Sequence, residues 1–170
     1  MRIFFALWPP PATARALAQW AGEAQGLTGG KATEQANIHL TLAFLGNVDP
    51  ARAMRAARRV DASAHRLPLE EARYWRENRI VWAGPKAVPS GLNGLAGKLG
   101  IELYREEFML ERRPFAAHVT LIRRARAARL PPLPAALDWP VNEFRLMRSS
   151  LSSAGASYEP LAFFPLSASG

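Results

Sequence analysis

The sequence contains no cysteine among its 170 residues. A disulfide framework, a cysteine nucleophile and a zinc site built on thiolates are therefore excluded. Long hydrophobic runs are also missing, because the apolar start of the chain is cut off by prolines at 9–11 and is too short for the core of a signal peptide. No later run has the length needed to cross a bilayer. We therefore expect a cytoplasmic protein with no membrane partner.

Lysine is scarce, and acidic residues are outnumbered. The chain has 22 lysines and arginines against 14 aspartates and glutamates, a formal charge of +8, and arginine supplies nearly all of the positive side. Arginine suits phosphate recognition because its planar guanidinium can bind two oxygens at once. A GC-rich genome explains the same enrichment equally well. The charge therefore supports an anionic partner without identifying one.

The length suits one domain, 1–170, or two small similar lobes that share a core. Hydrophobic periodicity, glycines and prolines predict strands and helices in alternating groups. The expected helices are 12–26, 50–62 and 89–107, and the expected strands are 2–8, 38–45, 67–75, 79–83, 108–111, 118–124, 141–151 and 158–166. This order indicates an α+β protein with largely antiparallel sheets. No feature demands a dimer, so we expect a monomer.

The pattern His-x-Thr-Leu occurs twice, at 39–42 and at 118–121. On a strand, side chains alternate between two faces, so His39 and Thr41 share one face and the apolar residues between them share the other. The first face is suited to chemistry and the second to the core. By the same parity, Phe44 is expected in the core.

A histidine and a threonine at this spacing can move a proton near neutral pH and donate a hydrogen bond to an oxyanion. A single pair of this kind on a strand usually has no functional role. Two copies favour function, because phosphoryl chemistry without a metal needs proton-transfer groups on opposite sides of one phosphorus. The third histidine, His65, has no patterned neighbours and is expected in a surface loop.

The segments 37–46 and 113–123 resemble the two signature motifs of the two-histidine phosphoesterases. The resemblance is to the branch of bacterial and archaeal RNA 2′,3′-cyclic phosphodiesterases, also called 2′-5′ RNA ligases. It covers nearly the whole chain, since the segments at 2–7 and 144–166 also look like that branch. Ala117 departs from the family, which commonly has proline before the second histidine, but this change leaves the histidine pair intact.

The resemblance implies two similar lobes, each a small antiparallel sheet with helices outside, and an active-site cleft between them. It also implies hydrolysis of a terminal 2′,3′-cyclic phosphate on RNA to a 2′-phosphate, and we therefore expect no metal and no cofactor. Carried over, His39 is the proton donor to the departing 3′ oxygen, and His118 is the proton acceptor that activates water. Thr41 and Thr120 bind the non-bridging phosphate oxygens. Arg123, further along the second motif strand and expected on the same face, neutralises the phosphate.

Two alternatives remain open. A phosphodiesterase or ligase could act on 2′-5′-linked or small cyclic nucleotides, which need a closed pocket where an RNA end needs an open basic groove. A non-catalytic protein could instead bind RNA ends, although binding gives no reason for two facing proton-transfer groups. Phe115 is a further candidate for stacking on a base. Arg112 and Arg113 are candidates for contacting RNA phosphates, and solvated loop charge is the favoured explanation for both.

Overall fold

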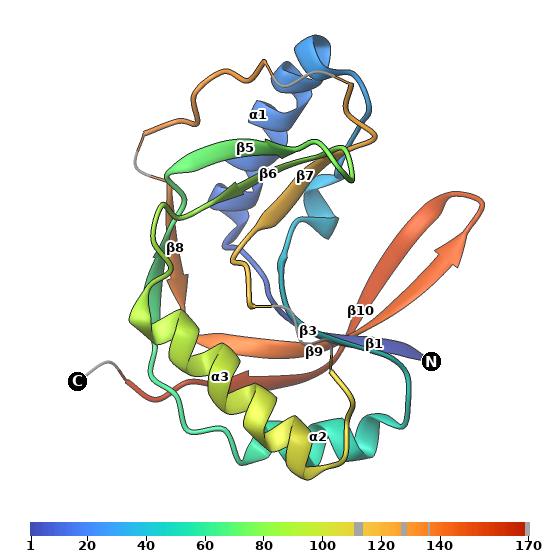
Figure 1. Cartoon of the computed structure of the whole chain (residues 1–170), viewed down its shortest axis with the longest axis vertical. Helices are drawn as coiled ribbons and strands as arrows, with labels where there is room; N and C mark the ends of the chain where they lie inside the picture. Colours follow the sequence, from blue (N-terminus) through green and yellow to red (C-terminus); the bar gives the residue numbers. More distant parts are fainter. Residues whose placement is uncertain (111–113, 127–128, 136, 169–170) are drawn as a thin grey trace.

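The computed structural model describes residues 1–110, 114–126, 129–135 and 137–168 (Figure 1). Its helices are α1 (Pro11–Thr28), α2 (Pro50–Arg58) and α3 (Ser90–Arg105), with a 3-10 turn at Gln35–Asn37. Its strands are β1 (Arg2–Leu7), β2 (Lys31–Ala32), β3 (Leu40–Asn47), β4 (His65–Pro68), β5 (Glu71–Trp75), β6 (Ile80–Gly84), β7 (Val119–Arg123), β8 (Asp138–Val141), β9 (Glu143–Ser152) and β10 (Gly155–Pro165). Within these described residues, no helix combines the length and apolar character that a membrane span requires.

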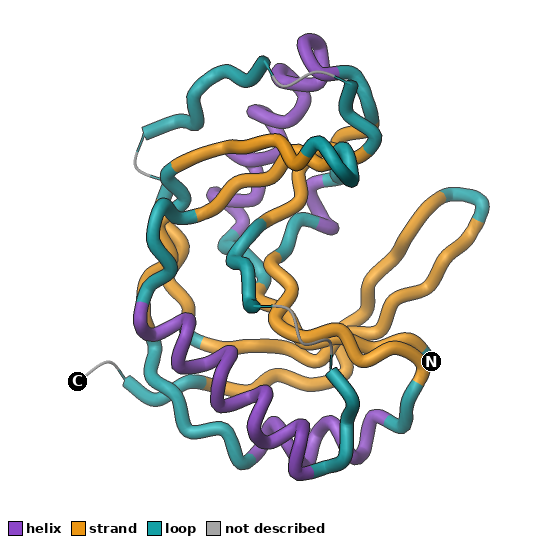
Figure 2. The backbone as a smooth tube through the Cα atoms, in the orientation of Figure 1, coloured by secondary structure: helices purple, strands orange, loops and turns teal. Residues whose placement is uncertain are grey.

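The strands fall into two lobes on either side of a junction between β3 and β7 (Figures 1 and 2). The first lobe contains β10, β9, β1 and β3 with α2 and α3, and the second contains β7, β6, β5 and β2 with α1. The pairings between these strands are antiparallel. The predicted α+β class with antiparallel sheets is therefore confirmed. In the described part of the chain the two ladders join through one residue pair, Leu40 with Val119.

Helix α1 forms where the sequence predicts it and covers the second lobe (Figure 1). Pro11 occupies its first turn, where a missing N–H costs nothing. The predicted apolar stripe is buried, with Leu17 fully buried and Trp20 3% exposed. The helix ends at Gly29, whose φ of 69° lies in the left-handed region that glycine tolerates.

Several element boundaries differ from the sequence-based expectation. Helix α2 ends at Arg58 instead of near Ala62. The strand predicted over 67–75 is divided in two, since β4 leaves the main sheet to pair with β8 while β5 pairs with β6. His65 therefore begins a strand instead of lying in a loop, and a Cβ added at Gly91 of α3 would meet its ring at 2.6 Å.

The strand predicted at 108–111 is wrong for its described part, 108–110. The chain leaves α3 through Glu107, which has a φ of 66°. The Phe108 amide then donates back to the Leu103 carbonyl at 3.0 Å, and the Phe108 side chain is 7% exposed. Phe108 thus closes the helix end with its ring buried, which explains the apolar pattern without a strand.

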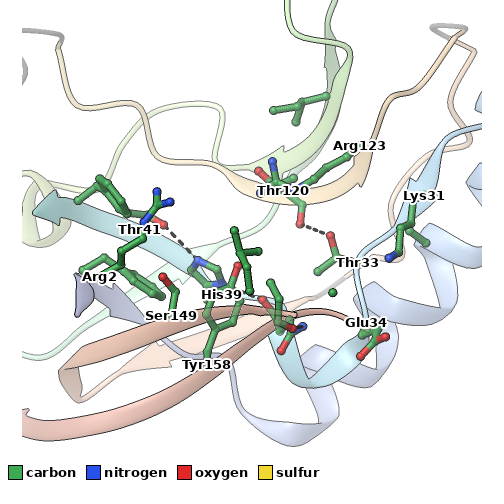
Figure 3. Close-up of a pocket in the computed structure, with 18 of the residues that line it drawn as sticks. Arg2, Lys31, Thr33, Glu34, His39, Thr41, Thr120, Arg123, Ser149 and Tyr158 are labelled. Carbon is green, nitrogen blue, oxygen red and sulfur yellow. Dashed lines mark hydrogen bonds between the residues drawn. The ribbon is translucent and has the colours of Figure 1, made fainter. Parts of the chain in front are cut away.

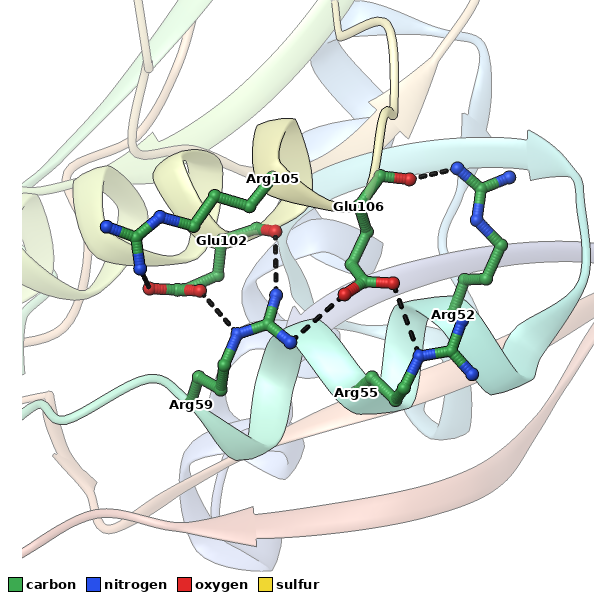
Figure 4. Close-up of polar contacts among 6 residues, drawn as sticks. All are labelled: Arg52, Arg55, Arg59, Glu102, Arg105 and Glu106. Carbon is green, nitrogen blue, oxygen red and sulfur yellow. Dashed lines mark hydrogen bonds and ion pairs between the residues drawn. The ribbon is translucent and has the colours of Figure 1, made fainter.

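A cluster of arginines and glutamates joins α2 to α3 (Figure 4). The Arg59 guanidinium lies 2.7 Å from a Glu102 carboxylate oxygen and 3.0 Å from a Glu106 carboxylate oxygen. Arg105 contacts Glu102 at 3.0 Å, and Arg55 contacts Glu106 at 3.3 Å. Hydrogen bonding to Arg59 lowers the pKa of Glu106. These pairs fix the two helices that cover one face of the first lobe.

Candidate active site

A cavity of about 670 Å³ lies where the two lobes meet (Figure 3). The five site residues predicted from the sequence all line it: His39 and Thr41 from the first lobe, and His118, Thr120 and Arg123 from the second. The structure therefore brings the two motifs together, although they are separated by more than seventy positions in the sequence. No group of three His, Asp or Glu side chains suited to holding a metal ion occurs in the described part of the chain.

The junction pair sets the arrangement of the two motifs. Each histidine immediately precedes its strand, so His39 flanks Leu40 and His118 flanks Val119. Leu40 and Val119 are fully buried and point away from the cavity. In an antiparallel ladder the neighbours of a pair run in opposite directions, so an approximate two-fold axis through this pair relates one His-x-Thr motif to the other. The symmetry places one imidazole and one hydroxyl on each side of the cavity.

A β-bulge follows the first motif. Thr41 pairs with Ala6 of β1, and Ala43 pairs with the residue before Ala6. Leu42 is therefore an extra residue, and Leu42 and Ala43 both pack against the core. Phe44 returns to the face of Thr41, is 51% exposed and lines the cavity. The expectation that Phe44 lies in the core was wrong, because strict alternation does not hold across a bulge.

A second bulge follows the second motif at the equivalent position. Thr120 pairs with Trp82 of β6, and Ile122 pairs with the residue before Trp82. Leu121 is therefore extra, and Leu121 and Ile122 are both fully buried. Arg123 lies three residues beyond Thr120, a spacing that regular alternation assigns to the opposite face, so the expectation that it shares the face of Thr120 did not follow from parity. The bulge is what brings Arg123 onto the cavity face.

Both histidines are held by the same backbone contact. His39 Nδ1 lies 2.7 Å from the Asn37 carbonyl oxygen, and His118 Nδ1 lies 2.9 Å from the Ala116 carbonyl oxygen. A carbonyl only accepts, so each Nδ1 carries the hydrogen and donates it. Nε2 is then the nitrogen left to exchange protons in each ring. In His39, Nε2 lies 3.1 Å from the Thr41 hydroxyl oxygen.

Aromatic rings enclose the His39 imidazole. Trp8 stacks on it with centroids 4.8 Å apart and an interplanar angle of 7°. Phe4 lies at 5.2 Å, and Tyr158 meets the imidazole edge-on at 5.1 Å. His118 has a comparable but more tilted enclosure, with Trp75 at 4.7 Å and 58°. The rings fix the orientation of each imidazole and keep water from its faces.

Burial lowers the pKa of both histidines. For His39, desolvation is the main cause; the Asn37 carbonyl opposes it, the positive charges of Arg123 and His118 add to it, and the pKa falls to about 4. For His118, desolvation again dominates; the Ala116 carbonyl opposes it, and Arg123 adds to the lowering of the pKa. In the free protein at pH 7, both rings are therefore neutral, each with an Nε2 that can accept a proton.

Further residues line the cavity that motif reasoning did not select. They include Arg2, Lys31, Ser149 and Tyr158 (Figure 3). Lys31 reaches the cavity because β2 pairs with the end of β7, opposite Arg123. The close approach requires glycine at the preceding position, Gly30, where an added Cβ would lie 2.3 Å from the Arg123 carbonyl oxygen. Pairing between distant strands carries no local sequence signal, which explains why these residues were missed.

The remaining candidates lie elsewhere. Phe115 lines a second cavity of about 460 Å³ between β3 and α3, which shares Phe44 with the main cavity, and Phe115 does not line the main cavity itself. Arg112 and Arg113 lie outside the described residues. His65 is in β4, away from both cavities.

Comparison with known proteins gives three kinds of match. The family model of LigT-like phosphoesterases matches residues 7–82. An Escherichia coli protein named RNA 2′,3′-cyclic phosphodiesterase is 33% identical over 164 residues, which cover 94% of this chain and 93% of that protein. A Thermus thermophilus protein of the same name is 33% identical over 186 residues, covering 98% of this chain and 90% of that protein.

The similarity extends to the three-dimensional structure. The crystal structure of E. coli LigT complexed with 3′-AMP superposes with a TM-score of 0.90 at 32% identity, covering 97% of each chain. Sequence and structure agree over nearly the full length. The chain belongs to the family of LigT-like phosphoesterases.

Proposed function

We propose that this protein is an RNA 2′,3′-cyclic phosphodiesterase that hydrolyses a terminal cyclic phosphate to a 2′-phosphomonoester without a metal. The observation that carries the proposal is the pair of imidazoles in one cavity, His39 and His118, each with Nδ1 bound to a carbonyl and Nε2 left to exchange protons. A binding protein has no use for this arrangement. The names of the E. coli and Thermus relatives support the same activity.

The reaction is an in-line displacement at phosphorus. In the proposed assignment, His118 Nε2 takes a proton from water as the water oxygen bonds to phosphorus. The bond from phosphorus to the 3′ oxygen breaks, and the His39 imidazolium gives its proton to that oxygen. The products are a 3′ hydroxyl and a 2′-phosphate, with the proton now on His118. Return of that proton to His39 through solvent restores the starting state.

Three further side chains are assigned to the phosphate. The Thr41 and Thr120 hydroxyls donate hydrogen bonds to its non-bridging oxygens, and Arg123 offsets the charge that grows there in the transition state. The bound phosphate anion also affects the histidines. The negative charge of the phosphate stabilises an imidazolium beside it, so substrate binding raises the low pKa of His39. His39 is then protonated in the complex and can give its proton to the departing 3′ oxygen.

We also propose that residues 1–170 act as one two-lobed catalytic unit on RNA ends, as a monomer in the cytoplasm. The five assigned residues come from one chain, so a second copy is not needed to complete the cavity. The cysteine-free composition is compatible with a reducing compartment.

The proposal is tested with a short RNA ending in a 2′,3′-cyclic phosphate, incubated in ¹⁸O-water with EDTA. We expect the protein to form a 2′-phosphate that carries one solvent oxygen. His39→Ala and His118→Ala should each lose this product. His65→Ala is their matched control, since it removes the histidine outside the cavity and should leave turnover unchanged. A requirement for added metal, or a 3′-phosphate product, would contradict the proposal.

A further inference from the structure

We propose that Lys31 binds the phosphodiester on the 5′ side of the terminal nucleotide, so that the enzyme prefers oligonucleotides to nucleoside 2′,3′-cyclic phosphates. This role rests on the proposed function and adds to it the length of substrate that the cavity selects. Lys31 lies on β2, lines the cavity and has no part in the reaction at phosphorus described above (Figure 3).

Lys31 and Arg123 are directly opposite each other in the antiparallel pairing of β2 with β7. Paired residues of an antiparallel ladder project from the same face, and like charges at such positions repel. In the described part of the chain, neither side chain forms an ion pair with a carboxylate. A bound anion would relieve this repulsion, so the pair is suited to holding negative charge between its two members.

The backbone around Lys31 is fixed against β7, although β2 has only two residues. Before Lys31, the Arg126 amide donates to the Thr28 carbonyl at 2.7 Å. After it, the Thr33 amide donates to the Leu121 carbonyl at 2.8 Å. The fold therefore holds the backbone of this lysine at the cavity wall, while its exposed side chain can adjust to a ligand.

The positive charge at the cavity exceeds what the reacting phosphate requires. A 2′,3′-cyclic phosphate carries one negative charge, and Arg123 is assigned to it. The described residues that line the cavity include Arg2, Lys31 and Arg124 as further cations, against the single carboxylate of Glu34. This excess favours a substrate with a second anionic group.

In RNA, the nearest second anion is the phosphodiester on the 5′ side of the same nucleotide, one ribose from the cyclic phosphate. Neighbouring strands lie about 5 Å apart, and the lysine ammonium sits on a flexible four-carbon stem. Lys31 can therefore reach this phosphodiester while Arg123 holds the cyclic phosphate. A nucleoside 2′,3′-cyclic phosphate has no group for Lys31 to bind.

The wall that faces Lys31 is built from small residues at the tip of the β9–β10 hairpin, namely Ala154, Gly155 and Ala156. A Cβ added at Gly155 would lie 3.8 Å from Lys31 Nζ, so a larger side chain there would cover the ammonium. Asn37 Nδ2 donates to the Ala156 carbonyl at 3.1 Å and ties the hairpin to the first motif. The hairpin thus bounds the cavity at this end and leaves the ammonium accessible to a phosphate.

The test compares two cytidine dinucleotides ending in a 2′,3′-cyclic phosphate, one joined by a phosphodiester and the other by an uncharged methylphosphonate. We expect the parent to show a kcat/KM about 3- to 30-fold higher on the phosphodiester substrate at low salt. In Lys31→Gln this ratio should fall to near one, whereas Lys31→Arg should retain most of it. Lys86→Gln removes an exposed lysine outside both cavities and is the matched control, with the ratio of the parent.

The ratio separates phosphate binding from folding and from the proposed function. An unfolded fraction lowers kcat/KM equally on both substrates and leaves the ratio unchanged. If the ratio in Lys31→Gln equals that of the parent, or if the parent does not distinguish the substrates, Lys31 does not bind the 5′ phosphodiester, although the hydrolytic activity stands. If the parent opens neither substrate, the proposed function itself fails.

Discussion

The imidazoles of His39 and His118 are set for proton transfer by the carbonyl two residues earlier in the chain. Asn37 and Ala116 supply these carbonyls, and each fixes Nδ1 as the protonated nitrogen of its ring. The Nε2 of each ring is then the site at which a proton is gained or lost. The two motifs differ in their surroundings, because His39 is stacked on Trp8 while the rings around His118 are tilted.

Because the pKa of each histidine is lowered in the free protein, we expect kcat/KM to be greatest at acidic pH. The pair is active when His39 is protonated and His118 is neutral. In the free protein, His39 loses its proton with a pKa of about 4. We therefore expect a bell-shaped profile of kcat/KM with its maximum below pH 6.5. The profile of kcat should lie at higher pH, since bound phosphate favours the imidazolium. A profile of kcat/KM that is flat from pH 4 to pH 8 would contradict this expectation.

The same shift links the stability of the fold to pH. The folded pKa of His39 is about 4, against 6.5 for the unfolded chain, so the unfolded state binds more protons between these values. The free energy of unfolding should therefore decrease as pH falls, by roughly 2 kcal/mol between pH 7 and pH 5. Urea denaturation at pH 7 and at pH 5 measures this difference in unfolding free energy.

Substitution isolates the contribution of His39 to this slope. His39→Gln should remove most of the difference in unfolding free energy between pH 7 and pH 5, leaving the smaller part that comes from His118. His65→Gln, the same substitution at the histidine outside the cavity, serves as the control. An unchanged slope in His39→Gln would show that His39 is not desolvated in the folded state.

At the scale of elements, each motif strand carries an extra residue directly after its motif threonine, Leu42 in β3 and Leu121 in β7. The sequence was sufficient to place His39, Thr41, His118 and Thr120 on one face, because each pair lies before its bulge. It was not sufficient for Phe44. The bulges depend on how β3 pairs with β1 and how β7 pairs with β6, which no local pattern records.

The other element errors have the same origin. Helix α1 and the hairpins of β5 with β6 and of β9 with β10 could be predicted, because periodicity and turn residues are local. The split between β4 and β5 could not, since β4 leaves the main sheet only to pair with β8, some seventy residues later. The prediction of a strand at 108–110 failed because a buried residue that closes a helix has the same apolar character.

The ion pairs between α2 and α3 provide a prediction at this scale. Arg59 separates the carboxylates of Glu102 and Glu106, and Glu102 is 9% exposed. Arg59→Gln leaves these like charges facing each other, so we expect a lower Tm, with the greater loss at low salt. Thermal unfolding at two salt concentrations measures this.

Arg58→Gln removes the same charge from an exposed position on the same helix. It should leave Tm close to that of the parent at both salt concentrations. If Arg59→Gln behaves like Arg58→Gln, the cluster does not contribute to holding α2 against α3.

At the scale of the whole molecule, the fold places the two His-x-Thr motifs on opposite sides of one cavity. The two ladders meet at Leu40 and Val119, and the cavity opens beside this pair. The family resemblance predicted two lobes, but the sequence could not show that, among the described residues, their strands join through one residue pair. Because each lobe supplies one histidine, neither lobe alone carries the proposed acid and base.

The central claim is that His39 and His118 act together on one phosphorus. It is tested most directly by kcat/KM on an RNA ending in a 2′,3′-cyclic phosphate, for the parent, His39→Ala, His118→Ala and the double variant. We expect each single change to lower kcat/KM by on the order of a thousandfold, and the double change to cost less than about tenfold more. A single variant that retains activity within a few-fold of the parent, or a double loss equal to the product of the single losses, would contradict the claim.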